Sequence, residues 1–120
     1  MSLRLGPAVR LRRHADFAVV QKTGRRVAGR FVTLLGKPNA LGCDRLGVIA
    51  SRRLGNAVVR NRAKRRLRDL FRHTQPDIAG RDGRPSFDFV AIPKREFVSG
   101  PMTVVTTDFR AAVRKLRGAD

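Results

Sequence analysis

The sequence predicts an α+β fold, in which helices pack on a small mixed β-sheet within a single domain. A length of 120 residues suits one domain with one modest core. Two segments, 57–72 and 108–116, carry apolar residues at helical spacing. Short segments rich in β-branched and apolar residues lie before and between them, bounded by Pro and Gly. The resulting order, helix–strand–strand–helix–strand–helix, is typical of an α+β sandwich.

The first half of the chain is expected to supply one helix and the first strands. The predicted elements are a loose arm over 1–9, a helix over 14–22, a short strand near 26–28, and strands over 30–36 and 45–51 joined by a turn over 37–44. Gly24 ends the helix. Apolar residues cover most of the circumference of this helix, so their spacing does not fix its buried side.

The second half begins with Gly55, which permits a sharp turn, and Asn56, a favourable helix N-cap. From there the predicted elements are a helix over 57–72, a loop over 76–85, a strand over 87–92, a turn over 97–101, a last helix over 108–116 and a tail over 118–120. Thr106 or Thr107 is expected to cap the last helix. Residues 1–120 therefore form one domain.

The charge of the chain points to a polyanionic partner. Lys and Arg number 27 against 9 Asp and Glu, which gives a net charge of +18. No apolar run approaches the roughly 20 residues that span a bilayer, and the N-terminal residues lack the apolar core of a signal peptide. We therefore expect a cytoplasmic protein with no membrane partner. The single Cys43 excludes an internal disulfide.

The basic residues concentrate in one stretch, 51–72, where nine of twenty-two residues are Arg or Lys and only Asp69 is acidic. The apolar face of the predicted helix contains Val59, Ala63, Leu67 and Leu70, and the opposite face contains Lys64, Arg65, Arg68 and Arg72. Like charges one helical turn apart repel each other, and a polyanion relieves that repulsion. The stretch therefore predicts a nucleic-acid-binding helix.

Residues able to perform catalysis are few. The two histidines lie beside Arg residues near helix ends, and no two carboxylates are three or four residues apart. Cys43 has no His or Cys near it in sequence, and no phosphate-binding glycine loop occurs. We expect no catalytic side chain, no protein-bound metal and no organic cofactor.

The stretch 51–68, SRRLGNAVVRNRAKRRLR, resembles the signature of the protein subunit of bacterial ribonuclease P. That signature has Ser and two basic residues, then Gly-Asn-Ala-Val, then Arg-Asn-Arg, then Lys-Arg, and this chain matches it without a break. The family also has a basic segment, here Leu11-Arg12-Arg13, before an Asp-Phe pair, here Asp16-Phe17. Its next Gly-basic element is present as Gly24-Arg25-Arg26. The resemblance extends over residues 10–117.

The resemblance implies a fold of order α-β-β-β-α-β-α with a left-handed βαβ crossover, a rare exception to the right-handed rule. It also implies an RNA-binding subunit that assists a catalytic RNA in removing the 5′ leader from precursor tRNA. The expected partners are those two RNAs, with no obligate protein partner. The expected cofactor is Mg²⁺, held mainly by RNA. The alternatives are a protein-only nuclease, which cleaves without an RNA subunit, and a ribosomal or other structural RNA-binding protein.

The resemblance further implies two groups of site residues. RNA contacts are expected from Arg52, Arg53, Arg60, Asn61, Arg62, Lys64, Arg65, Arg66 and Arg68. A cleft for the leader is expected from Phe17, Arg12 and Arg13. Phe17 fits a core position as well as a cleft. Gln21 stands where many members have a second aromatic residue. The Asn61 amide suits either a base or sugar, or a hydrogen bond to a neighbouring strand.

Overall fold

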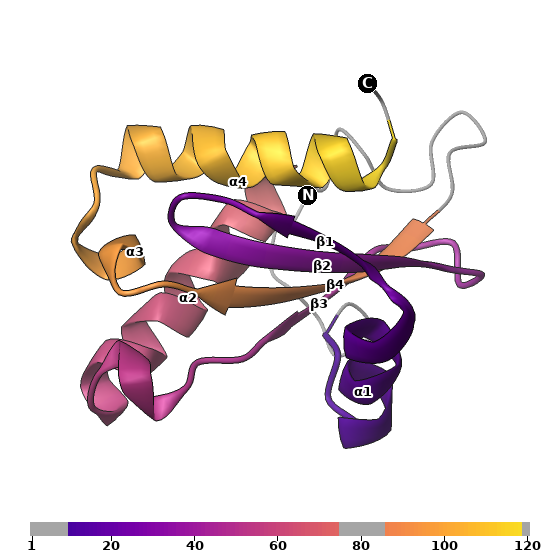
Figure 1. The fold of residues 1–120 in the computed structure, drawn as a ribbon, viewed down its shortest axis with the longest axis horizontal. Coiled ribbons are helices and arrows are strands. Elements are labelled where there is room, and N and C mark those ends of the chain that lie inside the picture. Colours follow the sequence, from indigo (N-terminus) through magenta and orange to yellow (C-terminus); the bar gives the residue numbers. More distant parts are fainter. Residues whose placement is uncertain (1–9, 75–85, 119–120) are drawn as a thin grey trace.

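The structure is a computed structural model and describes residues 10–74 and 86–118. The expected arm over 1–9 and the loop over 76–85 lie outside these residues, as do the last two residues of the expected tail. The elements, in order, are α1 (His14–Thr23), β1 (Arg25–Ala28), β2 (Val32–Asn39), β3 (Arg45–Val48), the 3₁₀ turn η2 (Arg52–Leu54), α2 (Ala57–Thr74), β4 (Ser86–Pro93), α3 (Glu96–Ser99) and α4 (Met102–Leu116). This arrangement confirms the α+β prediction (Figure 1).

The four strands form one mixed sheet in the order β1-β2-β4-β3. Strand β2 pairs antiparallel with both β1 and β4, and β4 pairs parallel with β3. The register places Arg45 opposite Asp88 and Gly47 opposite Val90. Arg10 adds a parallel bridge to Leu46 on the outer side of β3. The strand that comes last in the sequence thus lies between two earlier ones.

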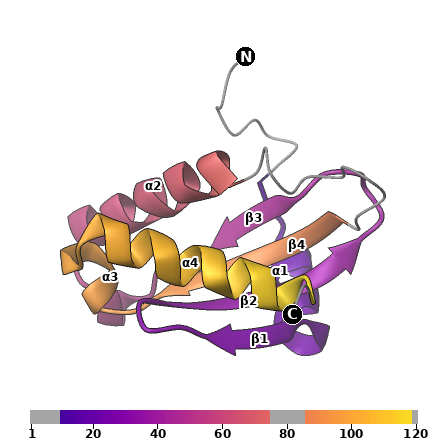
Figure 2. The same ribbon diagram turned by 90° about the horizontal axis from the view of Figure 1, so that it is seen from above.

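Helix α2 connects the parallel neighbours β3 and β4. In Figure 2, β3 and β4 both point to the left, β3 lies above β4, and α4 crosses in front of the sheet. Helix α2 packs into the same core cluster as α4, so the chain passes in front of the sheet on its way from β3 to β4. This sense of crossover is left-handed, as the family resemblance implies.

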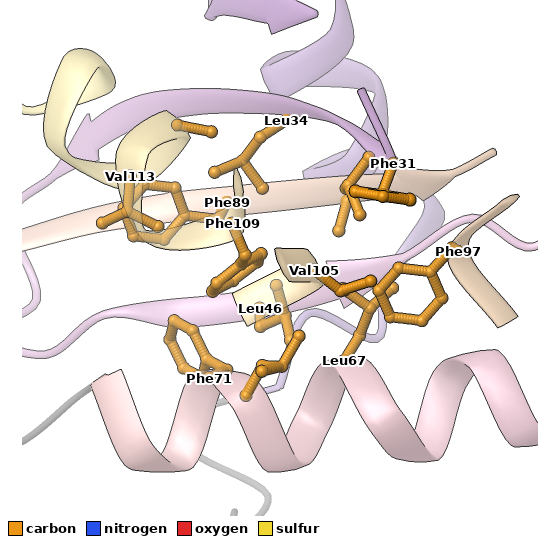
Figure 3. Close-up of a cluster of buried hydrophobic side chains, with 14 of the residues drawn as sticks. Phe31, Leu34, Leu46, Leu67, Phe71, Phe89, Phe97, Val105, Phe109 and Val113 are labelled. Atoms are coloured by element: carbon orange, nitrogen blue, oxygen red, sulfur yellow. The ribbon is translucent and has the colours of Figure 1, made fainter. Parts of the chain in front are cut away.

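Helices cover both faces of the sheet. Helices α2 and α4 lie on one face and α1 on the other (Figures 1 and 2). The larger core cluster, shown in Figure 3, fills the space between the sheet, α2, α3 and α4. In its centre the ring of Phe89 stacks on Phe87, 5.6 Å between centroids, and meets the edge of Phe71 at 6.2 Å. A smaller cluster under α1 contains Leu11, Val20, Leu35 and Val90.

The start of α2 follows the sequence prediction. The side-chain oxygen of Asn56 accepts a hydrogen bond from the Val59 N–H at 3.0 Å, as an N-cap does. Gly55 has a φ of 150°, a conformation that residues with a side chain rarely adopt. The apolar face predicted for this helix is confirmed at Ala63, Leu67 and Leu70, which are buried, and Val59 is half-buried at its edge.

The prediction for the last helix was wrong at its start. Helix α4 begins at Met102, with Pro101 at the N-cap position, so Thr106 and Thr107 lie inside the helix and cap nothing. The Thr107 hydroxyl donates to the Thr103 carbonyl at 3.0 Å, which satisfies it without a cap role. Buried Val105 explains the extra turn, because it adds apolar area to the core. A short helix, α3, also replaces most of the turn predicted over 97–101.

Strand β3 ends at Val48, earlier than predicted, although the Ile49 N–H still donates to the Ala91 carbonyl at 2.9 Å. The residues that follow turn away from the ladder toward η2.

A buried ion pair joins the end of α4 to the sheet. Asp44 is fully buried, accepts a hydrogen bond from the Phe87 N–H at 2.8 Å and pairs with Arg117. The Arg117 guanidinium also lies over the rings of Phe87 and Phe89, 5.2 and 5.5 Å from their centroids. Burial raises the pKa of Asp44, and the Phe87 N–H and the Arg117 charge oppose that rise.

Candidate nucleic-acid interface

The outer surface of α2 and of the preceding turn is cationic. Arg52 and Arg53 are exposed on η2, which directs them away from the core because Leu54 is the buried residue of that turn. On α2 the exposed members of the predicted set are Asn61, Arg62 and Arg65, and the half-buried ones are Arg60, Lys64 and Arg68. Together these side chains form a surface on which several phosphates can bind. We call it the α2 basic surface.

Arg66 differs from the others in the predicted set. Its guanidinium donates a hydrogen bond to the Val98 carbonyl at 2.6 Å and so fastens α2 to α3. Arg72, which the sequence places on the charged face, pairs with Asp69 one turn earlier. Both side chains therefore have partners within the domain. The Asn61 amide, by contrast, makes no hydrogen bond to any described residue, so it does not hold a neighbouring strand.

Arg68 connects the α2 basic surface to the segment before α1. Its burial, together with the charges of Arg10 and Arg12, lowers its pKa below the usual value. Arg10 is held against β3 by its backbone bridge to Leu46. Three guanidiniums thus gather where two elements meet, a concentration of like charge that a phosphate would relieve.

Phe17 lies on the opposite face of the sheet from α2. It is half-buried against the smaller core cluster, together with Ile49 and Ile92. Its ring sits directly on β3: a Cβ built on Gly47 would lie 2.5 Å from ring atoms Cε1 and Cζ. Only a glycine leaves room for the ring there. Phe17 is therefore neither a fully buried core residue nor a free ring, and exposed Gln21 provides no second ring beside it.

A groove of about 440 Å³ opens at the start of α1. It is lined by Arg10, Arg12, Arg13, Asp16, Leu41 and Arg45. Arg12 and Arg13, both predicted cleft residues, are exposed here and lie near the same helix as Phe17. The structure thus brings these three residues to one region.

Arg45 is largely neutralised within this groove. Its Nε and one terminal nitrogen donate to the two Asp88 carboxylate oxygens at 2.8 and 2.7 Å, and another nitrogen lies 3.9 Å from Asp16. Hydrogen bonding to Asp88 raises the pKa of Arg45. The pairing ties α1 to β3 and β4, which holds Phe17 over Gly47.

A second groove, of about 560 Å³, lies at the carboxyl ends of β3 and β4. Its lining consists of Ser51, Arg53, Leu54, Ile92, Pro93, Lys94 and Arg95. Neither Lys94 nor Arg95 is among the site residues predicted from the sequence. The available signal was a pair of basic residues directly after a strand that ends in Pro93, but their nearness to Arg53 depends on the sheet order.

Catalytic groups do not gather in the part of the chain that the structure describes. No group of three or more His, Cys, Asp or Glu side chains is placed there to hold a metal ion. Within the same residues, every helix is too short or too polar to span a membrane. A basic helical surface on an α+β sandwich, with a half-exposed aromatic residue on the other face, defines a nucleic-acid-binding domain.

Comparison with known proteins shows to which family this nucleic-acid-binding domain belongs. The family model for ribonuclease P matches residues 5–117. The ribonuclease P protein component of Ruegeria pomeroyi is 38% identical, over 88% of this chain and 84% of that protein, and that of Chloroflexus aggregans is 37% identical, over 93% and 78%. The solved RNase P protein of Staphylococcus aureus has a TM-score of 0.76 at 26% identity, covering 89% and 94% of the two chains. That of Thermotoga maritima has a TM-score of 0.73 at 28% identity, covering 90% and 94%.

The chain belongs to the ribonuclease P protein family. This result confirms the resemblance found at 51–68. It also confirms the prediction of an RNA-binding protein component of an endoribonuclease that processes tRNA, and it disfavours the ribosomal alternative.

Proposed function

We propose that the α2 basic surface binds the catalytic RNA of ribonuclease P, and that the sheet face beside Phe17 binds the 5′ leader of precursor tRNA. The observation that carries this proposal is the separation of the two surfaces. Cations that pair with no described carboxylate line the α2 side of the sheet, and the half-exposed ring of Phe17 lies on the α1 side. Arg12 and Arg13 precede α1, and the charge of Arg12 also reaches Arg68. Phosphate contacts position an RNA, whereas an aromatic ring stacks on unpaired bases.

In this proposal the protein contributes positive charge and leaves the chemistry to RNA. Leader and catalytic RNA repel each other where they run close together, and a domain of charge +18 between them lowers that repulsion. The described residues offer no acidic cluster that fits Mg²⁺, so we assign the ion mainly to RNA phosphates and derive no step from a protein-bound metal. The expected site of action is the cytoplasm.

Reconstitution tests this proposal. Precursor tRNA cleavage is measured across a Mg²⁺ titration with the catalytic RNA alone, with the protein alone and with both. We expect the protein to shift the Mg²⁺ midpoint of the RNA-dependent reaction downward and to produce no cleavage by itself. An unchanged midpoint would contradict the charge-screening role. Cleavage by protein from which all RNA has been removed would support the protein-only alternative.

A further inference from the structure

We propose that Asp16 is a positioning residue for the recognition of precursor tRNA. Through its contact with Arg45 it fixes the orientation of α1, and with it the place of the Phe17 ring, without touching RNA itself. The inference rests on the proposed function, because it concerns the surface that contains Phe17. It gives a task to a carboxylate in a cationic groove. Among the described residues that line the groove at the start of α1, Asp16 is acidic, whereas four are basic: Arg10, Arg12, Arg13 and Arg45.

Helix α1 has few contacts that can fix its orientation on the sheet. Seven of its ten residues are exposed, and the other three are Asp16, Phe17 and Val20, of which only Val20 is fully buried. These three residues lie on one narrow face, because residues four apart are one helical turn apart. Helices in proteins are held mainly by the packing of an apolar face. With so little apolar surface to bury, α1 depends on a polar contact to set its rotation.

The polar contact that α1 makes is with a rigid partner. The Arg45 guanidinium donates from two nitrogens to the Asp88 carboxylate, at 2.8 and 2.7 Å. Asp88 is held in turn by the Asn39 amide, whose Nδ2 donates to it at 2.6 Å. The remaining terminal nitrogen of Arg45 faces the Asp16 carboxylate at 3.9 Å. Because Arg45 cannot turn away without losing both bonds to Asp88, Asp16 is drawn to a fixed point on the sheet.

The contact of Asp16 lies directly beside the contact of Phe17. Arg45 and Gly47 are two residues apart on β3, so they point to the same face of the sheet. Consecutive residues of α1 therefore meet consecutive positions on one face of β3, Asp16 at Arg45 and Phe17 at Gly47. A helix released from the first contact can rotate about Val20. That rotation carries the ring of Phe17 away from Gly47.

Two simpler roles for Asp16 make different predictions. A carboxylate in the first turn of a helix interacts favourably with the helix dipole, and any residue that restores this charge would replace it. A negative charge in a cationic groove repels phosphates, so its removal alone would strengthen the binding of every RNA. Positioning predicts the opposite sign for precursor tRNA. The contribution to folding should be small, because a third of the Asp16 side chain is exposed, 33%, and such ion pairs contribute little to stability.

The test measures the affinity of the holoenzyme for precursor and for mature tRNA, together with kcat and KM for cleavage. Asp16→Asn should weaken precursor binding about three- to tenfold, a part of the loss expected when a base no longer stacks on a ring. Binding of mature tRNA and kcat should stay as they are, so that KM carries the change. Asp16→Glu, which keeps the charge and reaches further, should recover most of the affinity.

The matched control is Ala15→Glu/Asp16→Asn. Ala15 is exposed, so this double variant restores a negative charge to the first turn without placing it at Arg45. It should bind precursor as weakly as Asp16→Asn. Circular dichroism melting should show the same thermal midpoint for Asp16→Asn and wild type, whereas a clearly lower midpoint would mean a role in folding and would overturn the proposal.

The outcomes distinguish the positioning role from the proposed function. If the wild-type holoenzyme binds precursor and mature tRNA equally, the proposed function itself is contradicted. If it prefers precursor and Asp16→Asn does so to the same degree, the positioning role is wrong. Tighter binding of both tRNAs by Asp16→Asn would leave only the charge effect. Equal weakening for both tRNAs, or recovery in Ala15→Glu/Asp16→Asn, would also overturn it.

Discussion

Replacing Gly47 with Ala should displace Phe17 from the face of the sheet. The added Cβ would lie 2.5 Å from two ring atoms and 3.0 Å from the Leu11 Cβ, well inside the usual carbon–carbon contact of about 3.5–4.0 Å. Leu11 is held by the hydrogen bond from its N–H to the Leu46 carbonyl at 3.0 Å, so the ring is the part that must move.

The expected cost is about 1–3 kcal/mol of folding stability, the usual range for overpacking. Losing the burial of an aromatic ring falls in the same range, about 1.5–3 kcal/mol. If Phe17 contacts the leader, Gly47→Ala should also weaken precursor binding by up to tenfold, which corresponds to about 1.4 kcal/mol. Binding of mature tRNA should stay as it is.

Urea unfolding measures the first effect, and holoenzyme affinity for precursor and mature tRNA measures the second. The decisive control is the double variant Gly47→Ala/Phe17→Leu, in which a smaller side chain makes room for the new methyl group. Stability should return to that of Phe17→Leu alone, a non-additivity expected only for residues in contact. Additive losses, or a Gly47→Ala protein as stable and as selective as wild type, would refute the packing of Phe17 on Gly47.

Three further predictions follow from other parts of the structure. Lys64→Ala/Arg65→Ala should weaken assembly with the catalytic RNA and make that assembly less dependent on salt. For the wild-type protein, the slope of log K on log salt should be about −4 to −5 if six phosphates are neutralised. Filter binding across a salt series measures both slopes, and Arg110→Ala/Arg114→Ala is the matched control. Sulfate at tens of millimolar should raise the thermal midpoint of the free protein, because it binds the native state and relieves the repulsion among Arg10, Arg12 and Arg68; an unchanged midpoint contradicts this. Arg117→Ala should cost about 3–5 kcal/mol at neutral pH, because it leaves the Asp44 carboxylate buried and uncompensated. Burial raises the folded-state pKa of Asp44 above 3.8, so at lower pH its carboxylate becomes protonated and needs no counter-charge. The stability difference between wild type and Arg117→Ala should therefore shrink on acidification. Urea unfolding at about pH 4 and about pH 7 measures this difference, and an equal difference at both would show that Asp44 is solvated.

The sequence was most informative where local patterns decide the structure. Asn56 as an N-cap and the buried face at Ala63, Leu67 and Leu70 depend on spacing within one helix, and both predictions are confirmed. The start of α4 was missed because Thr106 and Thr107 are good capping residues, whereas the true start depends on the packing of Val105 against distant strands.

Tertiary contacts decided the rest. Arg66 could not be distinguished from its basic neighbours, because its acceptor, Val98, is 32 residues away in sequence. The packing of Phe17 on Gly47 and the presence of Arg53 and Arg95 in one groove also depend on the order of strands in the sheet, so neither could be predicted from sequence spacing. The family signature predicted the function without knowledge of these contacts, because it depends on residue types and their spacing and not on three-dimensional geometry.

The central position of β4 has a consequence for synthesis of the protein. Strands β2 and β3 leave the ribosome first, but each needs β4 between them before the sheet can close. Until Ser86–Pro93 has been made, α2 has no finished core to cover, and its apolar face stays open beside its arginines. Contacts between residues so distant in sequence form slowly. The nascent chain therefore presents a cationic, incompletely folded segment to a cell rich in RNA, and capture by RNA at that stage would compete directly with folding.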